Sequence, residues 1–122
     1  IDSFENGYQS LLGRGGINVS GGQKQRICIA RALLLHPKIL ILDDSTSAVD
    51  TKTERTIMKN IREVMKETTV LMATQRVSNM HAADRVVVLD DGHIEATGTH
   101  DELLESSEIY KEIYLSQQME TA

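Results

Sequence analysis

The feature that most constrains the fold is a run of four apolar residues, Ile39 to Leu42, which ends in the acidic pair Asp43-Asp44. A short continuous apolar run of this kind favours a β-strand that is covered on both faces. A segment with apolar residues at helical spacing follows it, and then a second strand-like segment, Thr69 to Ala73. The helical stripe consists of Ile57, Met58, Ile61, Val64 and Met65. Strand, helix and strand in this order predict a parallel βαβ unit and an α/β fold.

Capping residues mark where the first two helices begin. A helix is predicted from Gly21 to about Leu35, with Ser20 as its N-cap and Pro37 placed to end it. Thr51 to Glu54 has the spacing of a capping box and predicts the start of the helix that joins the two strands.

The C-terminal third predicts a hairpin followed by two helices. A strand over Arg85 to Leu89 leads into Asp91-Gly92, a strong hairpin signal, after which the chain returns over 94–96. Thr99 to Glu102 forms a second capping box. The last helix carries Ile109, Tyr110, Ile113 and Tyr114 on one side. The tail from Gln117 onward is expected to fray.

Composition excludes several classes of function. The net charge of -5 argues against binding a phosphate backbone, and one Phe, three Tyr and no Trp leave little for stacking on bases. No nucleic-acid partner is therefore expected. A single cysteine, Cys28, excludes an internal disulfide. The four histidines share no metal-ligand spacing, so surface or capping roles are predicted for them.

Polar residues follow both strands of the predicted βαβ unit. Asp43-Asp44 comes after the first strand, and Thr74-Gln75 comes after the second. Ligand sites of open α/β sheets lie outside the carboxyl ends of the strands, so these residues point to one site. The alternative is that they are merely the polar starts of loops. The Ser/Thr/Asp-rich segment from Ser45 to Asp50 favours the site.

A glycine-rich segment opens the first predicted helix. Gly21 and Gly22 follow Ser20, and free N–H groups together with the helix dipole favour an anion at such a position. The two glycines would let a phosphate approach the backbone closely. Ser-Gly-Gly alone is weak support for a phosphate site, because many helix starts share it.

Several longer segments of the chain resemble segments of the ATP-binding domains of ABC transporters, and they occur in the same order. Val19-Ser20-Gly21-Gly22-Gln23 resembles the signature motif, with Val19 in place of the usual Leu; residues 39–44 resemble the Walker B strand, and Ser47 to Asp50 the D-loop. Residues 84–89 and 98–104 are similar to the end of exporter-type domains.

The resemblance implies a P-loop NTPase-type parallel sheet flanked by helices, of which this chain is the C-terminal part. Residues 1–36 would form the signature-motif helical region, and residues 37–122 the core strands and C-terminal helices. The chain begins at Ile1 rather than Met and is short for such an ATPase, so the N-terminal half of the domain is expected to lie outside it. The isolated fragment is therefore expected to be inactive.

The family also implies roles for individual residues. Two such domains dimerise head to tail around two ATP molecules, so Ser20, Gly21, Gly22 and Gln23 would serve ATP held by the partner. Asp43 would act on Mg²⁺ through coordinated water for the ATP bound by this chain. Asp50 would lie at the dimer seam, between the two sites.

Two departures from the family pattern fall at catalytic positions. The residue after the Walker B Asp is normally Glu, and here it is Asp44, one methylene shorter. The switch position normally carries His, and here it is Gln75, which cannot carry a proton at neutral pH. Together they resemble the degenerate half of heterodimeric exporters, which hydrolyses ATP slowly. The alternative is a fully active homodimer.

A third departure lies outside the catalytic positions. Gly13-Arg14-Gly15-Gly16 stands where many exporters have a Gly-Glu-Arg-Gly stretch. In the family this loop contacts the coupling helices of the membrane domain.

Three functions remain open at this point. The first is the ATPase of an exporter, at the cytoplasmic face of the cell membrane and joined to a transmembrane domain. The second is a regulatory module that clamps ATP without turning it over. The third is a soluble ABC ATPase of repair or translation, against which the exporter-like ending counts.

Overall fold

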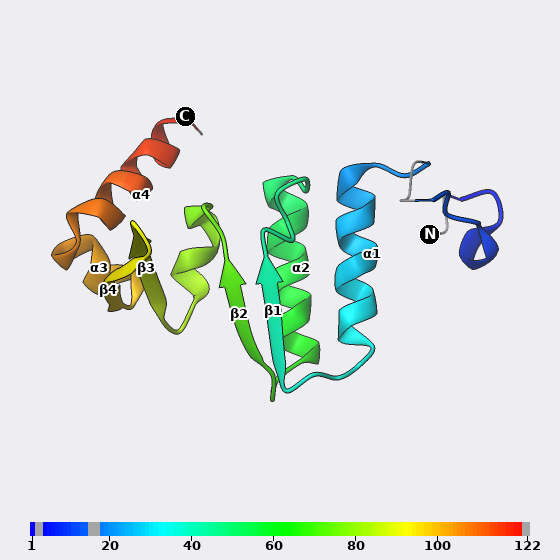
Figure 1. The fold of residues 1–122 in the computed structure, drawn as a ribbon, viewed down its shortest axis with the longest axis horizontal. Coiled ribbons are helices and arrows are strands. Elements are labelled where there is room, and N and C mark those ends of the chain that lie inside the picture. The colour runs from blue at the N-terminus through cyan, green and yellow to red at the C-terminus, as the bar shows by residue number, and fades with distance from the viewer. Residues whose placement is uncertain (2–3, 15–17, 121–122) are drawn as a thin grey trace. The chain divides into compact units, whose positions relative to one another are not determined.

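The computed structural model describes residues 1, 4–14 and 18–120, and the chain divides into two compact units, Ile1–Ala73 and Thr74–Ala122. The first unit contains a short 3-10 helix, η1 (Gly7–Gln9), then α1 (Gly21–Leu33), β1 (Ile39–Asp43), α2 (Thr51–Val64) and β2 (Thr69–Ala73). β1 and β2 pair in parallel, with Ile39 opposite Thr69 and Asp43 opposite Ala73 (Figure 1). The predicted βαβ unit and the α/β class are confirmed.

One face of this two-stranded sheet packs against both helices. Leu40 and Leu42 are 4% and 2% exposed and meet Ile29 of α1 and Ile61 of α2 in one apolar cluster. Because side chains alternate along a strand, Ile39 and Ile41 point the other way, and they are 63% and 64% exposed. The prediction that this strand is covered on both faces is therefore wrong within the described residues, since α1 and α2 lie on the same side.

The helices begin and end within about two residues of the predicted bounds. α1 begins after Ser20 as predicted but ends at Leu33, ahead of Pro37. The N-cap of α2 is Asp50, not Thr51, because the Asp50 carboxylate accepts from the backbone N–H of Thr53 at 2.9 Å. Val64, predicted in the buried stripe, is 70% exposed at the last residue of α2.

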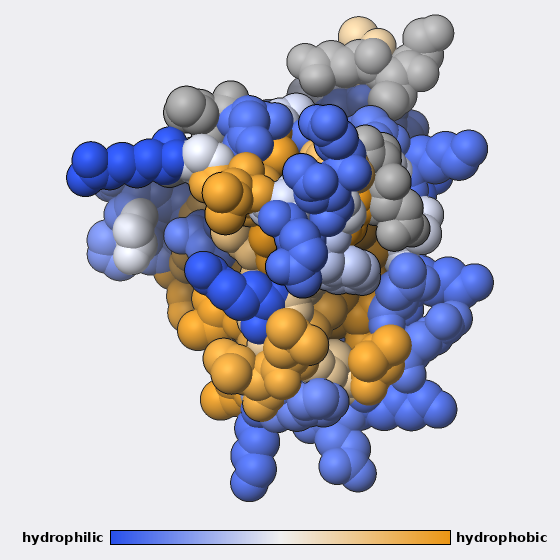
Figure 2. All heavy atoms as spheres, turned by 90° about the vertical axis from the view of Figure 1, so that its right-hand side faces the viewer, coloured by the Kyte–Doolittle hydropathy of each residue, from blue (hydrophilic) through white to orange (hydrophobic). Residues whose placement is uncertain are grey.

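Apolar side chains gather on the surface of the first unit at the end where both helices stop. Leu34 and Leu35, just after α1, are 77% and 81% exposed. Figure 2, which views the molecule from the α1 side, shows hydrophobic atoms concentrated toward the lower part of this face. The opposite end, where α1 begins, is predominantly polar on this face. Polar groups for a site are therefore found at the end where α1 and α2 begin.

The second unit is an antiparallel hairpin with two helices. It contains η2 (Val77–Ala82), β3 (Val86–Asp90), β4 (His93–Gly98), α3 (His100–Ser106) and α4 (Glu108–Glu120). Asp91 and Gly92 both have positive φ, 44° and 75°, as the predicted hairpin turn requires. Thr99 and Glu102 form the predicted capping box. Val88, Leu103 and Tyr110 form the core of this unit.

The predicted fraying from Gln117 is wrong as far as Glu120, where α4 ends. The side chain of Gln117 is tied to the start of the unit: its Oε1 accepts from the N–H of Val77 at 2.9 Å, and its Nε2 donates to the carbonyl of Gln75. Residues 121 and 122 lie outside the described residues. Within the described part of the chain, no helix is both long enough and apolar enough to span a bilayer.

Candidate functional site

The N-terminus of α1 is closed by a reciprocal pair of hydrogen bonds. The N–H of Gln23 donates to Ser20 Oγ at 3.2 Å, and the N–H of Ser20 donates to Gln23 Oε1 at 2.8 Å. The N–H groups of Gly21 and Gly22 come first in the helix, where no carbonyl lies one turn earlier to accept from them. They are available to oxygen atoms of an anion, and Gly21 is exposed.

Gly22 is required by a close approach between α1 and the loop that follows β1. A Cβ atom at Gly22 would lie 2.8 Å from the carbonyl oxygen of Ala48, and one at Gly21 would lie 3.2 Å from Ala48 Cβ. The loop over residues 44–50 therefore packs directly against the start of α1. In Figure 1 the start of α1, the carboxyl end of β1 and the start of α2 lie at the same edge of the first unit.

The loop over residues 44–50 is folded by its own hydrogen bonds. Asp44 has φ +47°, a left-handed conformation that Asp tolerates better than most residues. The carbonyl of Asp44 accepts from the N–H of Ser47 at 3.3 Å and from its hydroxyl at 3.1 Å. The N–H of Val49 donates to the carbonyl of Thr46 at 3.0 Å, and Val49 is 5% exposed. A turn in this shape places Asp43 and Asp44 with their side chains exposed.

One side chain from α1 and one from α2 hold this loop, a role that the sequence did not predict for either of them. Gln25, on α1, donates from Nε2 to the Asp44 carbonyl and to Ser47 Oγ, and its Oε1 accepts from the N–H of Ala48. Glu54, on α2, is fully buried and accepts from the hydroxyl of Thr46, itself 3% exposed. Glu54 is predicted as a capping residue, and its role in holding the loop is seen only from its burial and its hydrogen bond with Thr46.

Asp50 lies at the far end of the same loop. Its side chain is exposed, and the hydrogen bonds from Thr53 lower the pKa of its carboxyl below the usual value. Asp50 is therefore an anion at neutral pH at the start of α2. Among the described residues, no three His, Cys, Asp or Glu side chains gather in a group that could hold a metal ion. The first unit nevertheless offers exposed carboxylates at the end of β1, suited to contact Mg²⁺ through water.

The predicted site residues divide between the two units. The first unit brings Ser20 to Gln23 and the loop from Asp44 to Asp50 to one edge, with Asp43 ending β1. Gln75 belongs to the second unit, where it is exposed and its carbonyl accepts from Gln117. The prediction that Gln75 joins the same site stays a prediction, as does the division of the chain at residue 36.

Aromatic rings surround a buried histidine in the second unit. His100 is 5% exposed, and its Nδ1 lies 2.7 Å from the hydroxyl of Tyr110. The rings of His81 and Tyr114 lie 3.7 Å and 5.2 Å from that of His100, centroid to centroid. Burial lowers the pKa of His100, and the nearby His81 lowers it further. A surface or capping role was therefore wrong for His100, which is a core residue.

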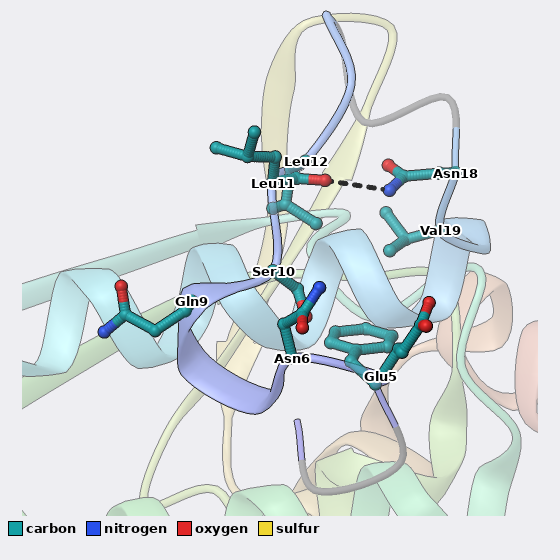
Figure 3. Close-up of a pocket in the computed structure, with 9 residues that line it drawn as sticks. Glu5, Asn6, Gln9, Ser10, Leu11, Leu12, Asn18 and Val19 are labelled. Carbon is teal, nitrogen blue, oxygen red and sulfur yellow. Dashed lines mark hydrogen bonds between the residues drawn. The ribbon is translucent and has the colours of Figure 1, made fainter.

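The segment ahead of α1 lines an open hollow (Figure 3), with a volume of about 490 Å³. Asn18 lies at its rim, donating to the carbonyl of Leu11 and accepting from the N–H of Gly13, both at 3.0 Å. The lining residues are Phe4, Glu5, Asn6, Gln9, Ser10, Leu11, Leu12, Asn18 and Val19. The segment Gly13-Arg14-Gly15-Gly16 differs from the family pattern, and its last two residues lie outside the described residues.

Comparison with known proteins identifies the family. The family model described as "ABC transporter" matches residues 3–47. A probable multidrug resistance ABC transporter ATP-binding/permease protein of Bacillus subtilis is 52% identical over 122 residues, covering 100% of this chain. An ATP-dependent lipid A-core flippase of Pasteurella multocida is 42% identical over 114 residues, covering 93% of the chain. The chain belongs to the ATP-binding domains of ABC transporters.

A solved ABC transporter has the same fold. The structure of a bacterial Atm1-family ABC exporter with ATP bound matches with a TM-score of 0.90 and 36% identity, over 95% of this chain. The predicted P-loop NTPase-type α/β fold of an ABC exporter domain is thereby confirmed. The chain spans 21% of the Bacillus relative, 20% of the Pasteurella one and 20% of the exporter of known structure.

Proposed function

We propose that this chain is part of an ATP-hydrolysing domain that powers export across a membrane. The observation that carries the proposal is the edge at which α1 begins, where the signature-like residues and the loop after β1 lie together. The neighbouring solved structure is an exporter with ATP bound, and the Bacillus relative is named as an ATP-binding/permease protein. A transmembrane domain is therefore the expected partner, with the ATP-binding part at the cytoplasmic face of the cell membrane.

The start of α1 serves an ATP molecule held by a second domain. The N–H groups of Gly21 and Gly22, with Ser20 and Gln23, suit the terminal phosphate oxygens, because free N–H groups and the helix dipole favour negative charge there. The capping box leaves these two N–H groups uninvolved while it fixes the first turn of the helix. This preorganised first turn supports the assignment of residues 20–23 to nucleotide binding.

The carboxylates after β1 serve the ATP molecule that this chain's own domain binds. Asp43, exposed at the last residue of β1, suits Mg²⁺ through coordinated water. Asp50, held as an anion at the start of α2, lies at the seam with the second domain. When bound, Mg²⁺ neutralises charge on the phosphates, and the residues of the chain position it and the attacking water.

The chain's own hydrolytic site is weak. Asp44 reaches one methylene less far than Glu toward an attacking water, and a misplacement of about 1 Å can cost on the order of 10²-fold in rate. Gln75 can donate a hydrogen bond to a phosphate but cannot carry positive charge. The second domain is then a different chain with a competent site, whose ATP the start of α1 completes.

A regulatory role is the second candidate, and the same two residues favour it. A site that binds ATP and hydrolyses it slowly acts as a clamp, holding the two domains together while the partner's site turns over. A soluble repair or translation ATPase is not retained, because the named relatives are a permease protein and a flippase.

The experiment restores the two catalytic side chains in a full-length heterodimeric transporter that carries this chain. With the other site inactivated, Asp44→Glu combined with Gln75→His is expected to raise the single-site hydrolysis rate, by up to on the order of 10²-fold. The matched control makes the same chemical changes at exposed positions of the second unit, Asp90→Glu with Gln118→His, and leaves the rate unchanged. An unchanged rate in the first variant would remove the degenerate-site proposal.

A further inference from the structure

A single side chain joins the start of α1 to the loop after β1. Gln25 lies on α1 just after the capping box, and it makes three hydrogen bonds to the loop. Its Nε2 donates to Ser47 Oγ at 3.0 Å and to the carbonyl of Asp44 at 3.3 Å. Its Oε1 accepts from the N–H of Ala48 at 2.9 Å. Both ends of the amide are therefore engaged with residues 44–48.

Only a side-chain amide of this length meets the three partners. The loop presents two acceptor atoms and one donor, and a side-chain amide offers two N–H donors on one atom and an acceptor oxygen on the same carbon. A carboxylate at position 25 would place a negative oxygen against the carbonyl of Asp44. Lys or Arg would offer no acceptor to the N–H of Ala48. The partners therefore favour Gln at position 25, and a charged side chain such as those of its neighbours Lys24 and Arg26 would not fit there.

The loop that Gln25 holds is also anchored on its other side. Thr46 is bonded to the buried Glu54 of α2, and Asp50 caps the first turn of α2. The backbone of Ala48 touches Gly22 so closely that no Cβ fits between them. A movement of Asp44 or Ser47 therefore reaches the start of α1 through the Gln25 amide, and the tight Gly22–Ala48 contact leaves no space that would absorb it.

We propose that Gln25 is a positioning residue that couples the two ATP sites to which this chain contributes. It transmits the position of the loop after β1, which carries Asp44, to the first turn of α1, which carries Ser20 to Gln23. Gln25 itself contacts neither nucleotide. The inference rests on the proposed function, because only a protein with both half-sites has two ATP sites to couple.

The test measures kcat and KM for ATP at the partner's site in the full-length transporter. Gln25→Glu keeps the size of the side chain and replaces the donor Nε2 by an acceptor oxygen. Gln25→Met keeps the size and removes all three hydrogen bonds. Both variants are expected to lower kcat at least about 10-fold with KM changed less than about twofold, because a misplaced signature turn aligns the phosphate poorly. Gln9→Glu, on the exposed η1, is the matched control and leaves both constants unchanged.

Coupling is distinguished from a structural role by a double-mutant cycle with Asp43→Asn. Asp43 belongs to this chain's own site, so its effect on kcat at the partner's site measures communication. In the Gln25→Met background, the fold-change in kcat caused by Asp43→Asn is expected to be at least about threefold smaller. If the two sites are independent, the same substitution has the same effect in both backgrounds. The inference is overturned if the effects are additive, or if kcat is unchanged in both Gln25 variants. In that case Ser20→Ala still impairs hydrolysis, so the proposed function is retained. If Ser20→Ala leaves hydrolysis intact, the proposed function itself fails.

Discussion

The hydroxyl of Thr46 donates a hydrogen bond to the carboxylate of Glu54, and both side chains are buried, at 3% and 0% exposure. This bond joins the loop after β1 to the first turns of α2. A buried carboxylate is costly unless hydrogen-bond donors surround it, so the Thr46 hydroxyl stabilises both the carboxylate and the loop. The loop therefore has a fixed shape before any nucleotide is present.

Replacing the hydroxyl tests this bond directly. Thr46→Val keeps the shape of the side chain but removes a donor from Glu54, so the free energy of unfolding of the chain is expected to fall by about 1–3 kcal/mol. Urea denaturation followed by circular dichroism measures it. Thr56→Val is the matched control on α2, where the Thr56 hydroxyl is exposed, and a change within about 0.5 kcal/mol is expected. Equal effects of the two substitutions would contradict a special role for Thr46.

The sequence predicted local structure well because short-range rules determine it. The βαβ order, the Ser20 and Thr99 caps and the Asp91-Gly92 turn depend on residues a few positions apart, and all are found. Within the described residues only one face of β1 is covered, contrary to the prediction, because the cover depends on which side each helix packs. The same applies to the contacts of Gln25 and Glu54: their partners lie on other elements, so no local pattern of the sequence predicts these contacts.

The close approach of α1 to the loop predicts that Gly22 tolerates no side chain. In Gly22→Ala the new Cβ would meet the Ala48 carbonyl at 2.8 Å, a backbone atom that cannot rotate away. Overpacking of this kind costs about 1–3 kcal/mol of unfolding free energy. Thermal unfolding of the chain measures the loss.

Gly21→Ala provides the comparison for Gly22. Its Cβ would meet a side-chain methyl at 3.2 Å, so a shift of a few tenths of an ångström relieves it. The loss of stability is expected to be smaller than for Gly22→Ala. The reverse order of the two losses would show that the loop does not pack against α1 as described.

The buried His100 predicts a pH dependence of stability in the second unit. Burial and the neighbouring His81 lower its pKa, while Asp101 partly opposes them; the other ionisable side chains that face it are Tyr110 and Tyr114. As the pH falls through the unfolded value of 6.5, the unfolded chain binds a proton at His100 more readily than the folded chain does, because the folded-state pKa is lower. The free energy of unfolding is therefore expected to fall with pH below this value.

Denaturation of the chain at several pH values between about 7.5 and 5.5 measures this dependence, on both sides of the ordinary histidine pKa. In His100→Gln the contribution of the buried imidazole is lost, so stability is expected to vary less with pH across this window. His93→Gln, at the exposed first residue of β4, is the control and should keep the pH dependence of the unchanged chain. If the two variants respond to pH alike, the buried imidazole is not its source.

The last prediction concerns ATP binding by these 122 residues alone. The start of α1 offers the N–H groups of Gly21 and Gly22 and the Ser20 hydroxyl, which suit only the terminal phosphate of a nucleotide. The sequence contains no Gly-Lys-Ser or Gly-Lys-Thr segment to cradle the other phosphates. A few contacts at one exposed helix start do not offset the entropy lost on binding. A Kd weaker than about 1 mM is therefore expected, which corresponds to less than about 4 kcal/mol of binding free energy.

Calorimetric titration with Mg-ATP measures this Kd, with the full-length transporter as the binding control. Micromolar binding by the chain alone would mean that these residues form a nucleotide site without a phosphate-binding loop, and the assignment of Ser20 to Gln23 to a partner's ATP would have to be abandoned.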